Sequence, residues 1–224
     1  MELNGVIRTD RKMADGRTIR YYDSKPTNRD ATDKRPKEAQ PNIGELRFDP
    51  LVNEWIAISS HRQNRIFLPP KELCPLCPTK GELLTEIPES DFEVVVFDNR
   101  SPSLSPTTND FALPDYAGPE TDKAEAIGKC EVVCFTSDHS QSFCDLSSTQ
   151  VRTLLEAWRD RTAELSKEAF IRHIAPFENR GEEIGVTLHH PHGQIYAYSY
   201  LPPRVEKMLA VARKYKEDFG KVLF

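Results

Sequence analysis

The sequence predicts an α+β fold with a largely antiparallel sheet and packed helices. Short runs rich in β-branched and aromatic residues recur along the 224-residue chain, which is typical of strands. Two longer segments carry apolar residues at helical spacing. The two kinds of segment do not alternate in the regular strand–helix–strand order of a parallel sheet, and this favours the α+β class.

The first 44 residues are polar and predict a small hairpin followed by a linker. Asp15-Gly16 is a turn signal just ahead of a run of large side chains at residues 19–22. Residues 24–42 are rich in proline and charged side chains, which is typical of a mobile linker. We therefore expect a hairpin-and-linker unit at 1–44, a main domain at 45–203 and a separate segment at 204–224.

The main domain contains several segments with strand character. Valine, isoleucine and aromatic residues dominate them, and proline, serine and aspartate fill the stretch at 101–128 between two of them. The expected strands and extended segments are residues 55–58, 92–97, 131–135, 170–177, 184–188 and 194–200.

Two helices are expected in the second half of the chain. Ser147 and Gln150 have the spacing of a capping box, which marks a helix start. The apolar stripe that follows consists of Val151, Leu154, Leu155, Trp158 and Leu165. A second helix is expected after Pro202-Pro203, with a stripe of Val205, Leu209, Ala212 and Phe219.

Bulk composition excludes several classes of protein. The net charge of -5 argues against non-specific nucleic-acid binding, which depends on clustered Lys and Arg. No apolar run reaches the roughly 20 residues that a membrane helix needs. The N-terminus lacks the apolar core of a secretory signal. We therefore expect a cytoplasmic protein that binds neither membrane nor nucleic acid.

Three of the six histidines lie within four residues of one another, at His189, His190 and His192. In an extended chain, side chains two apart share a face, so His190, His192 and Gln194 are expected on one face and His189 on the other. Gly193 leaves room for a ligand to approach the main chain. A single histidine is more often a structural residue, but this cluster beside a proline and a glycine favours a catalytic site.

The five cysteines predict a metal site. An odd number in a chain without a signal argues against a disulfide framework. Cys74 and Cys77 are spaced like a metal clip, and the surrounding prolines disfavour a redox pair at a helix start. Zinc takes about four N or S ligands, and His139 and His190 are candidates for the other two. The alternative is two cysteines in a proline-rich loop without a metal.

Two polar segments are candidates for binding a phosphorylated ligand. Arg62 and Arg65 are three residues apart, and guanidinium groups match phosphate oxygens in bidentate geometry. The alternative for this pair is a solvated surface. Asn179-Arg180-Gly181 is a polar turn after an expected strand, with an amide that could contact a base or hold the turn.

Taken together, the motifs resemble the galactose-1-phosphate uridylyltransferases, a branch of the histidine-triad superfamily. The resemblance runs from about residue 47 to about residue 203. It rests on Arg47-Phe48-Asp49-Pro50, Ser60-His61-Arg62, Cys74-Pro75-Leu76-Cys77, Phe97-Asp98-Asn99-Arg100, Phe135-Thr136-Ser137-Asp138-His139-Ser140, Phe177-Glu178-Asn179-Arg180-Gly181 and His190-Pro191-His192-Gly193-Gln194. It implies a histidine-triad-like fold for residues 45–203, and a helix at 204–224 that leads into a second half.

The resemblance also implies roles for individual residues. His192 is the expected nucleophile, with Gln194 beside it contacting the phosphoryl group. Zinc would be held by Cys74, Cys77, His139 and His190. The expected substrate contacts are Arg62, Arg65, Asn99, Asn179, Gly185, Thr187 and Gln194, with the two arginines reaching the phosphates from the neighbouring subunit of a dimer.

The implied reaction moves UMP from UDP-glucose to galactose 1-phosphate through a uridylyl-histidine, as in the Leloir pathway of galactose metabolism. Gln194 stands where related hydrolases carry a third histidine, and an amide cannot exchange a proton near neutral pH, which favours transfer over hydrolysis. One alternative is a nucleotide-sugar phosphorylase of the same superfamily. Another is a nucleotide- and zinc-binding half that is inactive without a partner chain. The expected assembly is a homodimer or a pairing with a separate C-terminal half.

Overall fold

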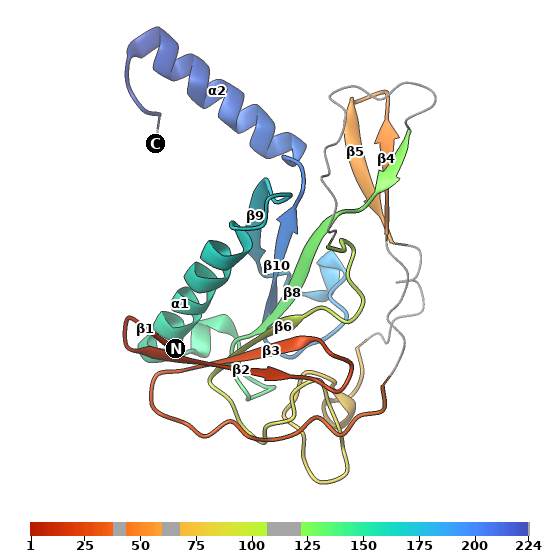
Figure 1. Cartoon of the computed structure of the whole chain (residues 1–224), viewed down its shortest axis with the longest axis vertical. Coiled ribbons are helices and arrows are strands. Elements are labelled where there is room, and N and C mark those ends of the chain that lie inside the picture. The colour runs from red at the N-terminus through yellow and green to blue at the C-terminus, as the bar shows by residue number, and fades with distance from the viewer. Residues whose placement is uncertain (38–43, 60–67, 107–121, 224) are drawn as a thin grey trace.

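A computed structural model of the chain describes residues 1–37, 44–59, 68–106 and 122–223, and it confirms the α+β class (Figure 1). The main body is an antiparallel seven-stranded sheet with the order β1-β2-β3-β6-β8-β10-β9. Its strands are β1 (Glu2–Leu3), β2 (Val6–Lys12), β3 (Thr18–Asp23), β6 (Val94–Asp98), β8 (Gly128–Cys134), β9 (His173–Phe177) and β10 (His192–Tyr198).

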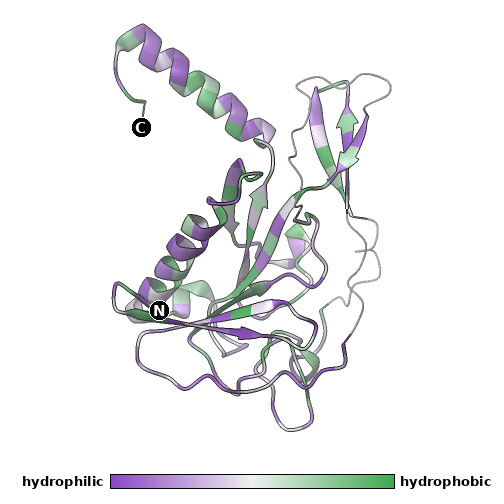
Figure 2. Cartoon of the chain, in the orientation of Figure 1, coloured by the Kyte–Doolittle hydropathy of each residue, from purple (hydrophilic) through white to green (hydrophobic). Residues whose placement is uncertain are grey.

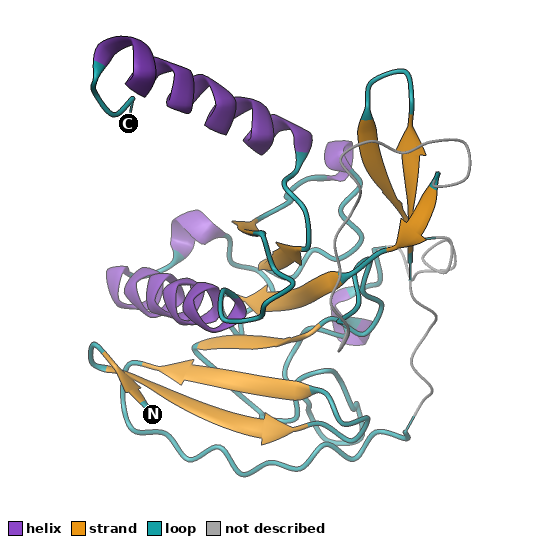
Figure 3. Cartoon of the chain, turned by 45° about the horizontal axis from the view of Figure 1, so that its top comes forward, coloured by secondary structure: helices purple, strands orange, loops and turns teal. Residues whose placement is uncertain are grey.

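A smaller antiparallel sheet stands apart from the helix α1 in both views of the ribbon (Figures 1 and 3). It consists of β4 (Glu45–Asp49), β5 (Glu54–Ile58) and β7 (Lys123–Glu125). The strands predicted at 55–58, 92–97, 131–135 and 194–200 are confirmed within one to three residues at their ends. The extended segment predicted at 170–177 is confirmed by β9 over its last five residues.

One face of the large sheet is covered by α1 (Ser148–Leu165). Leu154 and Ala157 of the helix pack with Val94, Val96 and Ile195 of the strands in one buried cluster. The predicted capping box is confirmed, because the Ser147 hydroxyl accepts from the Gln150 amide nitrogen at 3.2 Å and the Gln150 side chain accepts from the Ser147 amide nitrogen at 3.2 Å. Val151, Trp158 and Leu165 of the predicted stripe join this contact with the sheet, whereas Leu155 is 53% exposed and was wrongly assigned to the stripe.

The opposite face of the sheet carries a second buried cluster. Val95 and Phe97 alternate with the residues that face α1, so they point to this side. They pack with Cys74, Leu76 and Cys134 and with residues of the N-terminal hairpin. The loop that bears the cysteine pair is therefore built onto the core of the sheet.

The N-terminal hairpin is part of the sheet, which differs from the expected separate unit at 1–44. The turn at Asp15-Gly16 is present, with Gly16 at a φ of 89°. Strand β3 then pairs with β6, placing Tyr21 opposite Val95. Both faces of β3 thereby become buried, with Tyr22 in one cluster and Tyr21 in the other, which a prediction from the polar composition of this segment missed.

The expectation of a mobile linker at 24–42 is wrong for the part that the structure describes, residues 24–37. Arg29 forms a buried double hydrogen bond to Asp23, with N···O distances of 3.1 and 2.5 Å. Arg35 contacts Asp33 at 2.8 Å and the buried Glu86 at 2.6 Å. Arg29, Asp33 and Arg35 are ion-paired, and these pairs hold the segment against the domain.

The helix α2 (Pro203–Phe219) projects from the end of β10 and has no buried residue along its length, all of which is described. Met208, Val211 and Phe219 remain 50, 54 and 63% exposed, and Figure 2 shows apolar residues interspersed along the helix with polar ones. The predicted second helix is therefore confirmed but packs on nothing in the described chain. Among the described helices, none has the length and apolar character required to cross a membrane.

Residues 184–188, expected to be extended, form no strand. A short 3-10 helix, η4 (Glu182–Ile184), ends at Gly185, whose φ of 74° turns the chain away. The other 3-10 helices in the described chain are η2 (Lys71–Leu73) and η3 (Phe143–Asp145). The loop after η4 leads directly into the histidine cluster.

Candidate active site

The histidine cluster lies where the chain enters β10. Along this strand buried and half-buried residues alternate, with Gly193 and Ile195 buried. His192 and Gln194 therefore share the other face, as predicted. His190 precedes the strand, so this alternation does not orient it. Its ring instead contacts Cys77 and Thr136.

The four predicted metal ligands come together. The ligand atoms of Cys74, Cys77, His139 and His190 all lie within 4.8 Å of one another. The Cys77 sulfur is 3.3 Å from Nδ1 of His139 and 3.5 Å from Nδ1 of His190. The cysteines follow η2, and the histidines follow β8 and precede β10. Segments distant in the sequence thus supply one group that can bind a metal ion.

The chemistry of this group suits a metal cation. Burial raises the pKa of the Cys77 thiol to about 12 and lowers the pKa of His190 to about 4. A cation would offset the cost of ionising the buried thiols, and thiolates with neutral imidazoles are the donors that zinc-like ions prefer. The Nε2 atom of His190 donates to the carbonyl oxygen of Thr136 at 2.8 Å. This contact leaves Nδ1 with its lone pair toward the two sulfurs.

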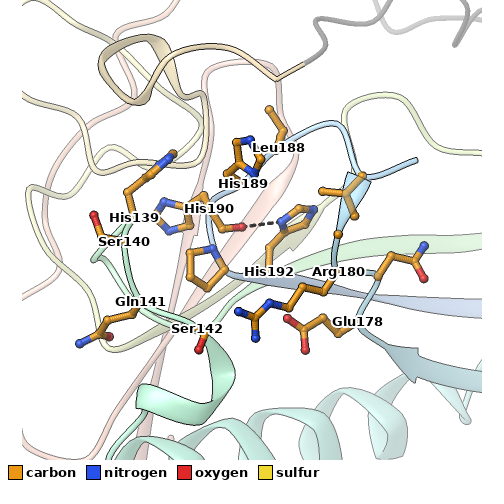
Figure 4. A pocket seen from close by; sticks show the side chains of 14 residues that line it. His139, Ser140, Gln141, Ser142, Glu178, Arg180, Leu188, His189, His190 and His192 are labelled. Carbon is orange, nitrogen blue, oxygen red and sulfur yellow. Dashed lines mark hydrogen bonds between the residues drawn. The ribbon is translucent and has the colours of Figure 1, made fainter. Parts of the chain in front are cut away.

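His192 has the tautomer that a nucleophile requires. Its Nδ1 atom donates to the backbone carbonyl oxygen of His190 at 2.7 Å, as the dashed line in Figure 4 marks. Because a carbonyl oxygen can only accept, Nδ1 carries the proton and Nε2 keeps a free lone pair. Burial also lowers the pKa of His192, which favours the neutral ring.

A cavity of about 300 Å³ lies beside His192. It is bounded by the turn after β9, the loop at 139–142 and the entrance to β10. In Figure 4, Arg180 and Glu178 lie below the His192 ring, Ser142 lies at the lower left, and His190 and His139 lie to the left. The cavity therefore joins a potential nucleophile to a guanidinium group and several hydrogen-bonding side chains.

The other predicted substrate contacts are placed as follows. Asn179 lines the cavity. Gln194 and Asn99 lie next to each other, with Nδ2 of Asn99 donating to Oε1 of Gln194 at 3.4 Å. Gly185 ends η4, and the carbonyl oxygen of Thr187 accepts from the Leu68 amide at 2.8 Å. Unlike Asn179, the residues Asn99, Gly185, Thr187 and Gln194 do not line the cavity. Arg62 and Arg65 fall outside the described residues.

The cavity is also lined by residues that were not predicted as site residues, among them Ser142, Arg180 and His189. Arg180 belongs to the polar turn at 179–181 that the sequence analysis singled out, but only Asn179 of that turn was given a role. His189 was assigned to the opposite face of an extended strand, but the chain bends before β10 and the cavity reaches it. Ser142 lies in a loop without a distinctive motif, so the sequence carries no comparable signal for it.

Gly193 is required by close packing beneath the site. A Cβ atom there would lie 2.6 Å from the Phe177 carbonyl oxygen and 2.9 Å from the Phe135 ring. Backbone and a packed ring cannot both move away, so Gly193→Ala is expected to reduce the free energy of unfolding by about 1–3 kcal/mol. Chemical denaturation measures this loss. A midpoint equal to that of the natural chain would contradict the packing argument.

Comparison with known proteins places these motifs in a family. Residues 32–202 match the family model for galactose-1-phosphate uridyl transferase, N-terminal domain. The chain is 44% identical over 214 residues to the galactose-1-phosphate uridylyltransferase of Streptomyces lividans, covering 95% of this chain and 54% of that protein. It is 42% identical over 177 residues to the protein of the same name from Thermotoga maritima. That match covers 79% of this chain and 54% of the Thermotoga protein.

The fold agrees with the sequence matches. A solved structure of a uridylyltransferase superposes with a TM-score of 0.63 at 29% identity, covering 80% of this chain and 53% of that one. This chain spans about half the length of the curated relatives it matches. The matched residues 32–202 include the candidate metal group and the histidine cluster. The chain therefore belongs to the galactose-1-phosphate uridylyltransferase family, whose N-terminal domain it matches.

Proposed function

We propose that this chain is the nucleotidyl-transferring half of a UDP-glucose–hexose-1-phosphate uridylyltransferase, with His192 as the nucleophile. The proposed reaction moves UMP from UDP-glucose to galactose 1-phosphate. The observation that carries the proposal is the Nδ1 contact of His192 with the His190 carbonyl, which leaves Nε2 as a nucleophile at the edge of the cavity. Family membership supports the choice of substrates.

The reaction has two displacement steps. Nε2 of His192 forms a bond to the α-phosphorus of UDP-glucose, the bond to the bridging oxygen breaks, and glucose 1-phosphate leaves. An oxygen of galactose 1-phosphate then attacks the same phosphorus, the phosphorus–nitrogen bond breaks, and UDP-galactose forms. A covalent intermediate divides one difficult step into two easier ones. The His190 carbonyl oxygen, through Nδ1–H, stabilises the positive charge on the substituted ring.

The remaining site residues bind and orient the substrate. Charge in phosphoryl transfer spreads over the oxygens around phosphorus, so positioned donors stabilise it. We assign this role to the amide of Gln194 and to the hydroxyl of Thr187, which stands where many family members have a phosphate-binding serine. Asn99, Asn179 and Gly185 are assigned to the nucleotide. An amide at position 194 cannot relay a proton to water, which favours transfer over hydrolysis.

We propose that the metal group binds one zinc ion with a structural role. Cys74, Cys77, His139 and His190 supply the four ligands that a closed tetrahedral site requires. A bound zinc ion would hold the 74–77 loop against the segment that leads into β10. The backbone carbonyl of His190 would then be fixed in position, and with it the His192 ring.

The proposed assembly is a homodimer or a pairing with a second half, in the cytoplasm. The exposed apolar residues Met208, Val211 and Phe219 on α2 support a contact with further protein. Intact-mass spectrometry after incubation with UDP-glucose tests the function. The expected result is an adduct of one UMP that is labile in acid and stable in base, formed slowly unless a second half is supplied. Transfer activity without any such adduct would overturn the proposal.

Arg62 and Arg65 are expected to bind the substrate phosphates. Replacing either with alanine should weaken UDP-glucose binding by roughly 1.5–3 kcal/mol, because a charge-assisted hydrogen bond is lost. Isothermal titration calorimetry measures the change, and Arg213→Ala on the exposed helix α2 is the matched control for loss of one charge. If both arginine variants bind UDP-glucose as tightly as the Arg213→Ala control, Arg62 and Arg65 belong to a solvated surface and do not bind phosphate.

A further inference from the structure

We propose that Arg17, at the tip of the N-terminal hairpin, is a positioning residue that sets the direction of the Gln194 side-chain amide. Residues 1–31 lie outside the family match of 32–202, and no role in the site has been assigned to them above. The chemical purpose of this direction, donation to a phosphoryl oxygen, rests on the proposed function. The positioning itself rests on contacts within the described chain.

The Arg17 guanidinium is buried and bonded to three partners. Its Nε atom donates to Asp15 at 2.8 Å, one terminal nitrogen donates to the buried Glu86 at 2.5 Å, and the other donates to the backbone carbonyl oxygen of Asp98 at 2.7 Å. The residue itself is 8% exposed. A planar guanidinium with this many partners has one orientation available to it.

The contact with Asp98 fixes the peptide unit that precedes Asn99. The carbonyl of that unit accepts from Arg17, and its N–H, which belongs to Asn99, donates to the carbonyl oxygen of Cys130 at 2.9 Å. The amide of Thr18 also donates to the Asp98 carboxylate at 3.1 Å. The hairpin and β8 therefore hold the peptide from both sides, and the Asn99 side chain starts from a fixed backbone.

The direction of the Asn99 amide is transmitted to Gln194. Oδ1 of Asn99 accepts from the backbone N–H of Ser101 at 2.9 Å. The oxygen of this side-chain amide therefore faces Ser101, and Nδ2 is left to donate elsewhere. Nδ2 donates to Oε1 of Gln194 at 3.4 Å. With its oxygen engaged, Gln194 has its NH₂ group left to donate. A donor suits a phosphoryl oxygen, whereas the opposite direction would place two acceptors together.

The same arginine connects the hairpin to the loop of the metal group. Glu86, which accepts from Arg17, donates its backbone N–H to the carbonyl oxygen of Pro75 at 3.0 Å, between the two cysteines. Met13 at the hairpin tip packs in the same buried cluster as Cys74 and Leu76. The hairpin thus supports both the cysteine loop, which belongs to the metal group, and the Asn99 turn, which contacts Gln194.

The test reads the side-chain amides directly. Arg17→Lys keeps the positive charge but loses the planar guanidinium group that reaches three partners at once. Glu86 is not left without a cation in this variant, because it also pairs with Arg35 at 2.6 Å and with Arg100 at 3.6 Å. In ¹H–¹⁵N spectra of the whole chain, the side-chain amide signals of Asn99 and Gln194 are expected to shift. Lys12→Met, which removes an exposed cation of the same hairpin, is expected to leave them in place.

The outcomes are decisive without substrate. The two side-chain amide signals are assigned by their loss in Asn99→Ala and Gln194→Ala. If these signals do not shift in a folded Arg17→Lys variant, the proposal is overturned. Arg17→Gln is the second variant should the lysine variant fail to fold. Its side chain is shorter and can still donate, but it cannot span from Glu86 to the Asp98 carbonyl.

Kinetics separate positioning from simple destabilisation. Arg17→Lys is expected to slow adduct formation with UDP-glucose about ten-fold, which corresponds to about 1.4 kcal/mol. In an Asn99→Ala background the same change should have no further effect, because Arg17 acts through Asn99. Additive losses would contradict this coupling. Transfer activity of the complete assembly without any adduct would refute the proposed function, whereas the spectra of the chain alone would still decide the role of Arg17.

Discussion

Replacement of His192 with alanine is expected to abolish nucleotidyl transfer, with a loss on the order of 10⁴-fold or more in the rate of the complete assembly. The reason is that Nε2 of His192 is the atom that forms the bond to phosphorus, and nothing replaces it in the variant. Intact-mass spectrometry should show no UMP adduct. The metal content should stay near that of the natural chain, because His192 is not among the four clustered ligands.

His189→Ala is the matched control for this prediction. It removes an imidazole from the same cavity, but His189 belongs neither to the metal group nor to strand β10. The variant should still form the adduct, and peptide mapping should place the UMP on His192. A label on another residue, or full transferase activity in His192→Ala, would show that the proposed nucleophile is wrong.

Cys74→Ser is expected to release the metal and to destabilise the fold by on the order of 5 kcal/mol, a large part of a domain's total stability. Cys74 is 1% exposed and belongs to the buried cluster beneath the sheet. A serine oxygen is a poorer ligand for a soft metal ion, and the remaining Cys77 thiol would then sit beside two histidines without a cation to stabilise its ionised form. Denaturant unfolding and elemental analysis measure the two effects.

The exposed Cys144 supplies the control. Cys144→Ser removes a thiol of the same chemistry from a position outside the metal group, so both the metal content and the unfolding midpoint should be unchanged. One metal ion per chain and an unchanged midpoint in Cys74→Ser would refute the site. Equal losses in both variants would point to a general effect of thiol removal.

The elements that the sequence predicts well are those with a local signal. Helix α1 follows the N-cap Ser147, where the predicted capping box is present, and every member of its predicted apolar stripe except Leu155 packs on the sheet. The metal group could be proposed because CxxC spacing and a histidine after a strand are themselves local patterns. Its four members then needed the tertiary fold to meet, and the structure brings their ligand atoms within 4.8 Å.

The features that the sequence did not predict depend on distant partners. Arg29 and Arg35 belong to a segment whose composition is that of a linker, and only the positions of Asp23 and Glu86 make it ordered. The chain at 184–188 has strand-forming side chains, but no strand among the described residues pairs with it, and Gly185 turns it away. Ion pairs and strand pairings between distant residues produce no periodic pattern in the sequence, so they could not be predicted from it.

The order of the strands determines when the site can form during synthesis. Strand β3 cannot pair with β6 until more than 70 further residues have been synthesised, and β8 cannot pair with β10 until β10 has been made. His190, the last member of the metal group, emerges from the ribosome more than 110 residues after Cys77. Contacts this distant in sequence form slowly. The two thiols of the group are therefore made long before its second histidine, and the group is complete only once His190 has been made.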